Sequence, residues 1–290
     1  MGAAIGFIGI GQMGRPMVER LAGAGLQVHA FDRRAEALEP LATVAGVHRA
    51  ASADAVADAC DTVILMLPDS RIVDALLWTD GLAARMKRGS LLIDMGSSDP
   101  NATRANQTRL AAAGVALVDA PVSGGVRRAV DGSLAIMVGG APADVERALP
   151  LLAPMGKTIV PVGPPGAGHA VKALNNYVSA AGLVAACEAL VAAEKFGIDP
   201  SVANKVFNAS TGRNNTTDVK VEQFMLSGAF NSGFAAALMR KDLDTAHALM
   251  ESLGSERALM AACAKMWQQA ESTLPKGADH TSMFTFVKQG

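Results

Sequence analysis

A short apolar segment leads into a glycine-rich turn near the start of this chain: residues 4–14 read Ala-Ile-Gly-Phe-Ile-Gly-Ile-Gly-Gln-Met-Gly. The β-branched and aromatic residues of 4–8 predict a buried strand, and the stretch 13–24 predicts a helix. A strand that turns directly into a helix is typical of the first half of a βαβ unit. The opening therefore predicts an α/β fold with a parallel sheet.

The turn itself has the spacing G-x-G-x-x-G. In a strand-turn-helix context Gly9 makes the tight turn, Gly11 lets a pyrophosphate approach the backbone, and Gly14 brings the helix against the strand. The free N–H groups of the helix start then favour the phosphates. We therefore expect a dinucleotide here, with Gln12 and Met13 as further members of the cofactor site.

The end of the next predicted strand bears on the choice of cofactor. Asp32 stands where a carboxylate can accept hydrogen bonds from the adenosine ribose hydroxyls and would repel the 2′-phosphate of NADP. Arg33 and Arg34 follow directly, and a guanidinium could bind that phosphate, or both could simply be solvated. The carboxylate favours NAD, and NADP stays open.

Strand-like and helical segments alternate over the first part of the chain. Further apolar, β-branched runs predict strands at 27–31, 62–67, 90–95, 116–119, 134–138 and 158–162. Helical patterns lie between several of them, at 35 onward, 70–78, 101–113 and 142–152. Nearly continuous apolarity of the strands indicates a doubly wound parallel sheet of the Rossmann type, covered by helices on both faces. We assign it to residues 1–163.

The pattern changes at a Pro/Gly cluster, Gly163–Gly166. Beyond it no strand-like alternation occurs, and long Ala/Leu/Val/Met stretches predict an all-α domain of residues 164–290. Its first helix should run from Ala167 to Phe196 and link the two domains. A helix so long and so apolar must be covered, either as the core of the second domain or at a subunit interface.

Composition excludes several classes of protein. The chain has 26 Lys and Arg residues against 27 Asp and Glu residues, a formal net charge of −1, so no overall basic field attracts nucleic acid or an anionic membrane. Three separated cysteines (Cys60, Cys187, Cys263) form no Cys-x-x-Cys motif and suggest reduced core residues, no metal site and a cytoplasmic protein. Neither a membrane span nor a signal peptide is expected.

A lysine on the long apolar helix is the first catalytic candidate. Lys172 and Asn176 stand at i and i+4 and share one helical face. As a neutral amine Lys172 could take a hydroxyl proton while hydride leaves the same carbon. The alternatives are a lysine whose ammonium reaches solvent past an apolar stem and an Asn bonded to backbone. His169, in the first turn, is a competing base or an ordinary solvated or capping residue.

A glycine-rich turn after the strand 116–119 is the second candidate. Ser123, Gly124 and Gly125 offer a hydroxyl beside exposed N–H groups, which suits a substrate carboxylate; a plain turn is the alternative. Arg127 and Arg128 lie just beyond and either add positive charge or face water.

Four segments together resemble the β-hydroxyacid dehydrogenase family, the group that contains 3-hydroxyisobutyrate dehydrogenase and tartronate semialdehyde reductase. They are Gly9–Gly14, Asp119–Gly125, Gly166–Asn176 in the pattern G-x-G-x-x-x-K-x-x-x-N, and Lys241-Asp242-Leu243. The resemblance spans essentially the whole chain. It implies a Rossmann domain, an all-helical C-terminal domain and an active site in the cleft between them.

The resemblance also implies roles for single residues. Lys172 becomes the catalytic acid/base and Asn176 its positioning partner, and Ser123–Gly125 becomes the loop that binds the substrate carboxylate. Further cofactor contacts are implied at the following positions: Leu67, Pro68, Ser97 and Lys241. Ser97 replaces the Thr of many relatives but keeps the hydroxyl, whereas Arg127 and Arg128 replace small residues and leave the tail of the substrate open.

The expected activity is hydride transfer between NAD(P) and the CH–OH group of a small 3-hydroxy acid, with 3-hydroxyisobutyrate as the first choice. Tartronate semialdehyde (2-hydroxy-3-oxopropionate) or sulfolactaldehyde reduction is the alternative within the family. A cofactor-binding interaction module without turnover is the alternative from another class. The expected partners are a small anionic substrate and further copies of the chain, in a homodimer or homotetramer.

Overall fold

A computed structural model describes residues 4–290 of the chain. The chain divides into two compact units, of which one ends at Lys172 and the other is Ala173–Gly290. The boundary lies inside a single long helix, α8 (Ala167–Phe196).

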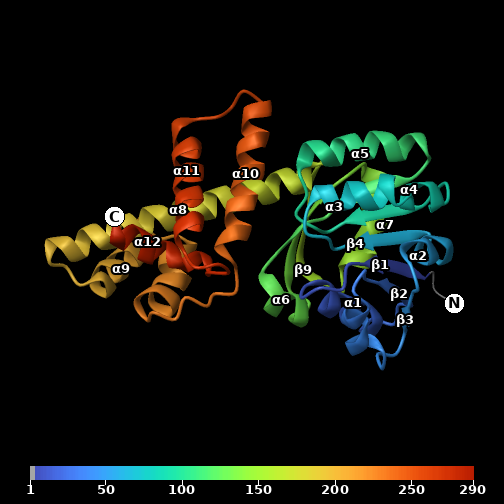
Figure 1. The fold of residues 1–290 in the computed structure, drawn as a ribbon, viewed down its shortest axis with the longest axis horizontal. Helices are drawn as coiled ribbons and strands as arrows, with labels where there is room; N and C mark the ends of the chain where they lie inside the picture. Colours follow the sequence, from blue (N-terminus) through green and yellow to red (C-terminus); the bar gives the residue numbers. More distant parts are fainter. Residues whose placement is uncertain (1–3) are drawn as a thin grey trace. The chain divides into compact units, whose positions relative to one another are not determined.

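A nine-stranded sheet forms the centre of the first unit (Figure 1). Its strand order is β3-β2-β1-β4-β5-β6-β8-β7, with β9 paired to β8. The strands are β1 (Ile5–Ile8), β2 (Val28–Phe31), β3 (Val47–Arg49), β4 (Thr62–Leu65), β5 (Leu91–Asp94), β6 (Ala116–Asp119), β7 (Val122–Ser123), β8 (Leu134–Gly139) and β9 (Gly156–Gly163). The first six are parallel and form the doubly wound, Rossmann-type arrangement that the strand-helix alternation predicts.

Both faces of this sheet are buried because successive side chains point to opposite sides. On β1, Phe7 belongs to one apolar cluster and Ile8 to the other. The first cluster also receives residues of α1 (Gly14–Gly23), the 3₁₀ helix η1 (Ala35–Leu41), α6 (Gly125–Asp131) and α7 (Pro142–Leu152). The second receives residues of α2 (Ala53–Ala59), α3 (Ser70–Asp74), the π-helix η2 (Ala75–Thr79), α4 (Leu82–Arg85) and α5 (Pro100–Ala112).

The sequence predicts a parallel sheet, and the structure differs from this beyond β6. β8 is antiparallel to both β6 and β7. The chain after β6 makes the two-residue strand β7 and returns through α6, a helix of 7 residues. The part between β7 and β8, residues 124–133, is shorter than the dozen or more residues that a parallel crossover needs. The sequence does not predict β7 or the short, largely exposed β3, because neither has an apolar run.

The second unit is helical, as the sequence predicts. Its core lies along one side of α8, where Ala180, Leu183, Cys187 and Leu190 are fully buried. Trp267, a large and fully buried side chain, belongs to the same cluster. The remaining helices are α9 (Pro200–Ala209), the π-helix η3 (Thr216–Leu226), α10 (Ala236–Ser252), α11 (Ala258–Thr273), the 3₁₀ helix η4 (His280–Ser282) and α12 (Met283–Gln289). In Figure 1 α10 and α11 lie side by side.

By length and composition alone, α8 could cross a membrane. Its most apolar window is 44% buried inside the protein, however, and its buried side chains belong to the core of the second unit. The helix therefore has the place of a core helix, one of the two roles that the sequence predicts for it.

The three cysteines are free and buried. Burial raises the pKa of the Cys60 thiol to about 11, that of Cys187 to about 12 and that of Cys263 to about 11. Thiols of this kind are core residues, and they do not act as nucleophiles near neutral pH.

The carboxylate of Asp279 ties together the chain around the start of α10. It accepts hydrogen bonds from Ser232 Oγ, the backbone N–H groups of Gly233 and Phe234, and both Thr281 N and Oγ1, at 2.6–3.2 Å. Burial of this carboxyl would raise its pKa, but hydrogen bonds, including one with His280, outweigh burial and hold the pKa well below its usual range.

We expect Asp279→Asn to lower the free energy of unfolding by about 2–3 kcal/mol, because an amide NH₂ would face N–H donors. Since the folded-state pKa is depressed, the advantage of the carboxylate is fully present above the ordinary pKa of Asp and is lost as the pH falls below it. Urea denaturation of the wild-type protein and of Asp279→Asn should therefore show a difference in the free energy of unfolding at pH 7 that becomes smaller toward pH 3. A difference that grows toward acid pH would show that the hydrogen-bond network does not favour the ionised carboxylate.

Candidate functional site

The three glycines of the first turn meet three different surroundings. Gly9 has φ +103°, and a Cβ there would lie 2.3 Å from the carbonyl oxygen of Met66. A Cβ on Gly14 would lie 1.9 Å from the carbonyl oxygen of Gly9, so α1 can pack on β1 only with glycine at this position. A Cβ on Gly11 would meet no heavy atom within 4 Å. The fold thus requires Gly9 and Gly14, whereas the space beside Gly11 stays open for a ligand.

A cavity of about 290 Å³ opens at this turn. It is bounded by the ends of β1 and β2, the segment after β4, and the start of α3 with η2. Of the predicted cofactor residues it is lined by Gly9, Gly11, Asp32, Arg33, Leu67 and Pro68. Of the other predicted ones in the first unit, Gln12, Met13, Gly14 and Ser97 do not line it.

Asp32 lies directly after β2 with its carboxylate fixed at the rim of this cavity. Oδ2 accepts the Ile10 N–H at 2.7 Å, and Oδ1 accepts the Arg34 N–H at 2.9 Å. Arg33 forms an ion pair with Asp80, which the sequence does not reveal because the two are far apart in the chain. An open space at Gly11, a helix start and a fixed carboxylate fit a dinucleotide with free ribose hydroxyls.

The segment that carries Ser97 follows β5 and is held by a buried carboxylate. Asp94 accepts hydrogen bonds from the Gly96 N–H at 2.9 Å and from Ser98 Oγ at 2.7 Å. A Cβ on Gly96 would lie 2.5 Å from the carbonyl oxygen of Leu67. Ser97 is therefore next to the Leu67 segment that lines the cavity, although it is not itself part of the lining.

The predicted carboxylate loop lies at β7 and the start of α6. Ser123 pairs with Ala135 of β8, and Gly124 and Gly125 have φ angles of +128° and +68°. A Cβ on Gly124 would lie 2.3 Å from Cδ of Arg128, so the stem of this arginine covers the glycine. Arg127 and Arg128 are both exposed.

The first turn of α8 is fastened to the end of β6. Asp119 Oδ1 accepts the Gly166 N–H at 2.7 Å, and Oδ2 accepts the His169 N–H at 2.9 Å. A Cβ on Gly168 would lie 2.5 Å from the carbonyl oxygen of Met137. The G-x-G part of the motif thus allows the helix to start against the backbone of the sheet.

Lys172 and Asn176 lie one turn apart on α8, as the spacing predicts. Lys172 is half-buried, and Asn176 is buried. Asn176 Nδ2 donates to Asp242 Oδ2 at 2.5 Å, and Asp242 Oδ1 lies 3.5 Å from Lys241 Nζ. Asp242 therefore joins two predicted site residues, a role that the sequence does not show.

His169 is neither solvated nor placed as a base. Its side chain is fully buried, and Nδ1 lies 2.8 Å from Thr103 Oγ1 on α5. A ring enclosed in this way cannot reach a substrate hydroxyl, so Lys172 remains the base candidate on this turn.

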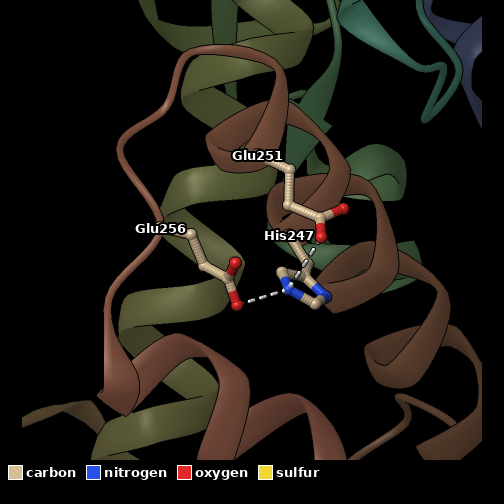
Figure 2. Close-up of side chains that lie close together, drawn as sticks. All are labelled: His247, Glu251 and Glu256. Carbon is tan, nitrogen blue, oxygen red and sulfur yellow. Dashed lines mark hydrogen bonds and ion pairs between the residues drawn. The ribbon is translucent and has the colours of Figure 1, made fainter.

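Outside these segments the fold gathers His247, Glu251 and Glu256, which the sequence does not single out (Figure 2). His247 Nε2 lies 2.9 Å from Glu256 Oε1 and 3.8 Å from Glu251 Oε1. Only the i, i+4 spacing of His247 and Glu251 is a local signal, because Glu256 joins from beyond the end of α10. Ion pairing accounts for the group.

Two family models match the chain. Residues 4–163 match the NAD-binding domain of 6-phosphogluconate dehydrogenase. Residues 166–287 match the NAD-binding domain of NADP-dependent 3-hydroxyisobutyrate dehydrogenase.

Known proteins resemble the chain over most of its length. The solved structure of Mycobacterium tuberculosis 3-hydroxyisobutyrate dehydrogenase with L-serine has a TM-score of 0.90 and 33% identity, and the match covers 99% of this chain and 100% of that one. A 2-(hydroxymethyl)glutarate dehydrogenase of Eubacterium barkeri is 38% identical over 83% of this chain and 80% of its own. An NAD-dependent L-serine dehydrogenase of Pseudomonas aeruginosa is 35% identical over 87% of this chain and 86% of its own.

Proposed function

Because the chain belongs to the β-hydroxyacid dehydrogenase family and is an NAD(P)-dependent oxidoreductase acting on the CH–OH group of hydroxy acids, we propose that it interconverts 3-hydroxyisobutyrate and its semialdehyde. One observation carries the proposal: Asp119, the last residue of β6 before the loop that bears Ser123, also accepts the N–H groups of Gly166 and His169 at the start of α8, the helix that bears Lys172. A proton acceptor and a carboxylate-binding loop are thereby fixed to the same strand end.

In the proposed mechanism Ser123, Gly124 and Gly125 bind the substrate carboxylate through the hydroxyl and the backbone N–H groups. Lys172 Nζ then accepts the proton of the substrate hydroxyl as the C–H bond breaks, and it returns a proton to the aldehyde oxygen in the reverse direction. Bound nicotinamide supplies the hydride acceptor. Asn176, fixed by Asp242, orients the hydroxyl group.

The substrates of the relatives set the alternatives. L-serine and 2-(hydroxymethyl)glutarate, like 3-hydroxyisobutyrate, carry a primary hydroxyl on the carbon next to the one that bears the carboxylate. Exposed Arg127 and Arg128 keep tartronate semialdehyde and sulfolactaldehyde as further candidates, because both present an additional polar or anionic group.

Steady-state kinetics with each of these compounds and both nicotinamide cofactors tests the proposal. We expect the highest kcat/KM with 3-hydroxyisobutyrate. A higher value for sulfolactaldehyde would replace the substrate but keep the reaction, whereas no turnover of any of them would refute the proposed activity.

We further propose that NAD is the preferred cofactor. Asp32 is fixed where it favours free ribose hydroxyls, and Asp80 pairs with the arginine that could bind a 2′-phosphate. Asp80→Asn removes the ion pair that holds Arg33, so the guanidinium can bind the 2′-phosphate instead. We expect KM for NADP to fall about 2- to 5-fold, which corresponds to the free energy of an exposed ion pair.

KM for NAD should not change in Asp80→Asn, because the ribose contacts are left intact. Asp58→Asn, which breaks the exposed pair with Arg85 outside the cavity, is the matched control. If Asp80→Asn and Asp58→Asn gave the same KM for NADP, Arg33 would play no part in cofactor choice.

We propose a homodimer or homotetramer in the cytoplasm, through apolar residues that the second unit leaves exposed. Phe196 is 84% exposed and Val178 is 70% exposed. Ile198, Val202 and Val206 follow at i, i+4 spacing and are also exposed. Surfaces of this kind mark contacts between proteins. Analytical ultracentrifugation should give a molecular mass of two or four times 29.7 kDa, and the mass of a monomer would contradict this assembly.

A further inference from the structure

His169 is a fully buried histidine that the proposed mechanism leaves without a role. Its Nε2 has no hydrogen-bond partner among residues 4–290. A buried ring nitrogen without a hydrogen-bond partner costs free energy. Other interactions must therefore favour a histidine in the first turn of α8.

The first reason is a directional hydrogen bond to α5. The Thr103 hydroxyl donates its single hydrogen to the carbonyl oxygen of Asp99 at 2.9 Å. Thr103 Oγ1 lies 2.8 Å from His169 Nδ1, and with its own hydrogen on Asp99 it can bond this nitrogen only as the acceptor, from an Nδ1 that carries the proton. Such a bond fixes the rotation of the imidazole and of the helix turn that bears it.

The second reason is the pair of carboxylates on either side of the ring. Asp94 Oδ2 lies 3.8 Å from Nε2, and Asp119 Oδ2 lies 3.8 Å from Nδ1. All three side chains are at most 4% exposed. At these distances the ring contacts the ends of β5 and β6 at the same time.

Each of these ends leads into a proposed site segment. Asp94 holds the turn that contains Ser97, and Asp119 begins the loop that contains Ser123. Lys172 follows His169 by three residues, so it lies one turn along the same helix. One side chain thus lies among the three segments that carry the proposed cofactor, substrate and proton-transfer residues.

We propose that His169 is a positioning residue for the dehydrogenase reaction: held between Asp94, Asp119 and Thr103, its imidazole sets the rotation and depth of the first turn of α8, and with them the position of Lys172. The proposal rests on the proposed acid/base role of Lys172. Positioning of a proton acceptor acts on the chemical step and leaves cofactor affinity unchanged, which separates it from a general loss of stability.

The test compares His169→Leu with His169→Asn, whose Nδ2 can replace the Nδ1 donor to Thr103. We expect kcat for 3-hydroxyisobutyrate to fall about 10- to 100-fold in His169→Leu, the effect of a small misplacement. His169→Asn should recover a large part of the loss. The dissociation constant of NADH should stay within about 2-fold of wild type in both.

The partner on α5 provides a matched pair of substitutions. Thr103→Val removes the acceptor of the Nδ1 proton and should lower kcat. Thr108→Val on the same helix removes an exposed hydroxyl that donates to the carbonyl oxygen of Arg104, and it should leave kcat unchanged. In the double variant His169→Leu/Thr103→Val, the second substitution should not lower kcat further, because each single substitution removes the same hydrogen bond.

The deuterium isotope effect on kcat, with substrate labelled at the carbinol carbon, separates positioning from folding. A misplaced Lys172 makes the chemical step slower relative to product release, so the isotope effect should rise in His169→Leu. Unfolding removes active molecules but leaves the isotope effect of the remainder unchanged.

Two results would overturn the proposal: wild-type kcat in both His169→Leu and Thr103→Val, or a kcat that falls only in proportion to the folded fraction with an unchanged isotope effect. Lys172→Ala distinguishes the two levels of the argument. If Lys172→Ala kept normal turnover, the proposed mechanism itself would fail. If it lost turnover while His169→Leu kept it, only the positioning role would fail.

Discussion

Lys172→Ala is expected to lower kcat for 3-hydroxyisobutyrate by about 10²- to 10⁴-fold, the usual contribution of a positioned acid/base group. The side chain is half-buried on α8, the helix whose start Asp119 fastens to the sheet, and alanine leaves no group there that can accept the proton. The affinity for NADH should stay near that of wild type, because Lys172 does not line the cavity at Gly9–Gly14. Steady-state kinetics and NADH fluorescence titration measure the two quantities separately.

Two variants control this experiment. Lys172→Arg keeps a positive charge but cannot act as a base near neutral pH, and it should be nearly as inactive as Lys172→Ala. Lys195→Ala removes an exposed lysine from the end of the same helix and should keep wild-type kcat. Near-normal turnover in Lys172→Ala would refute the assignment of the acid/base.

Gly11→Ala and Gly14→Ala change the same turn but should affect different properties: Gly11→Ala the affinity for NADH, and Gly14→Ala chiefly the stability of the fold. A Cβ on Gly11 meets nothing within 4 Å, so Gly11→Ala should fold normally. The methyl group would stand where the pyrophosphate approaches the backbone, and we expect a loss of NADH affinity of roughly 10- to 100-fold, about 1.4–2.8 kcal/mol.

Gly14→Ala places Cβ 1.9 Å from the carbonyl oxygen of Gly9, and backbone must move to make room. We expect it to lower the free energy of unfolding by about 3 kcal/mol or more and to weaken NADH binding as well. Thermal unfolding and fluorescence titration check both changes.

Gly23→Ala, at the exposed end of α1 with no atom within 4 Å of the new Cβ, should change neither property by much. Unchanged NADH affinity in Gly11→Ala would mean that the dinucleotide does not bind along this turn.

Local signals were sufficient for much of the fold. The alternation of apolar strands with helices predicts five of the six parallel strands but not β3, and the apolar stretch after the Pro/Gly cluster predicts α8 with its observed ends. The parallel sheet predicted from the sequence does not include the antiparallel β8, because strand direction depends on how the chain returns through α6 and not on apolarity.

The candidate site shows the same limit. The glycine turn, Asp32, Lys172 and Asn176 stand in patterns of fixed spacing, and the sequence can therefore propose them as site residues. Partners that meet only in the folded chain leave no such pattern. Thr103 and His169 are 66 residues apart, Asn176 and Asp242 are 66 apart, and Arg33 and Asp80 are 47 apart.

The most direct test of the central claim is the fate of the hydrogen on the carbinol carbon. The purified protein would be given NAD and 3-hydroxyisobutyrate deuterated at carbon 3, and the reduced cofactor would be analysed by mass spectrometry. The account predicts that each turnover places one deuterium on the nicotinamide and yields the semialdehyde, and that Lys172→Ala slows the transfer about 10²- to 10⁴-fold. Binding of the cofactor with no deuterium transferred from the hydroxy acid would contradict it, and would leave a protein that holds the cofactor without using it.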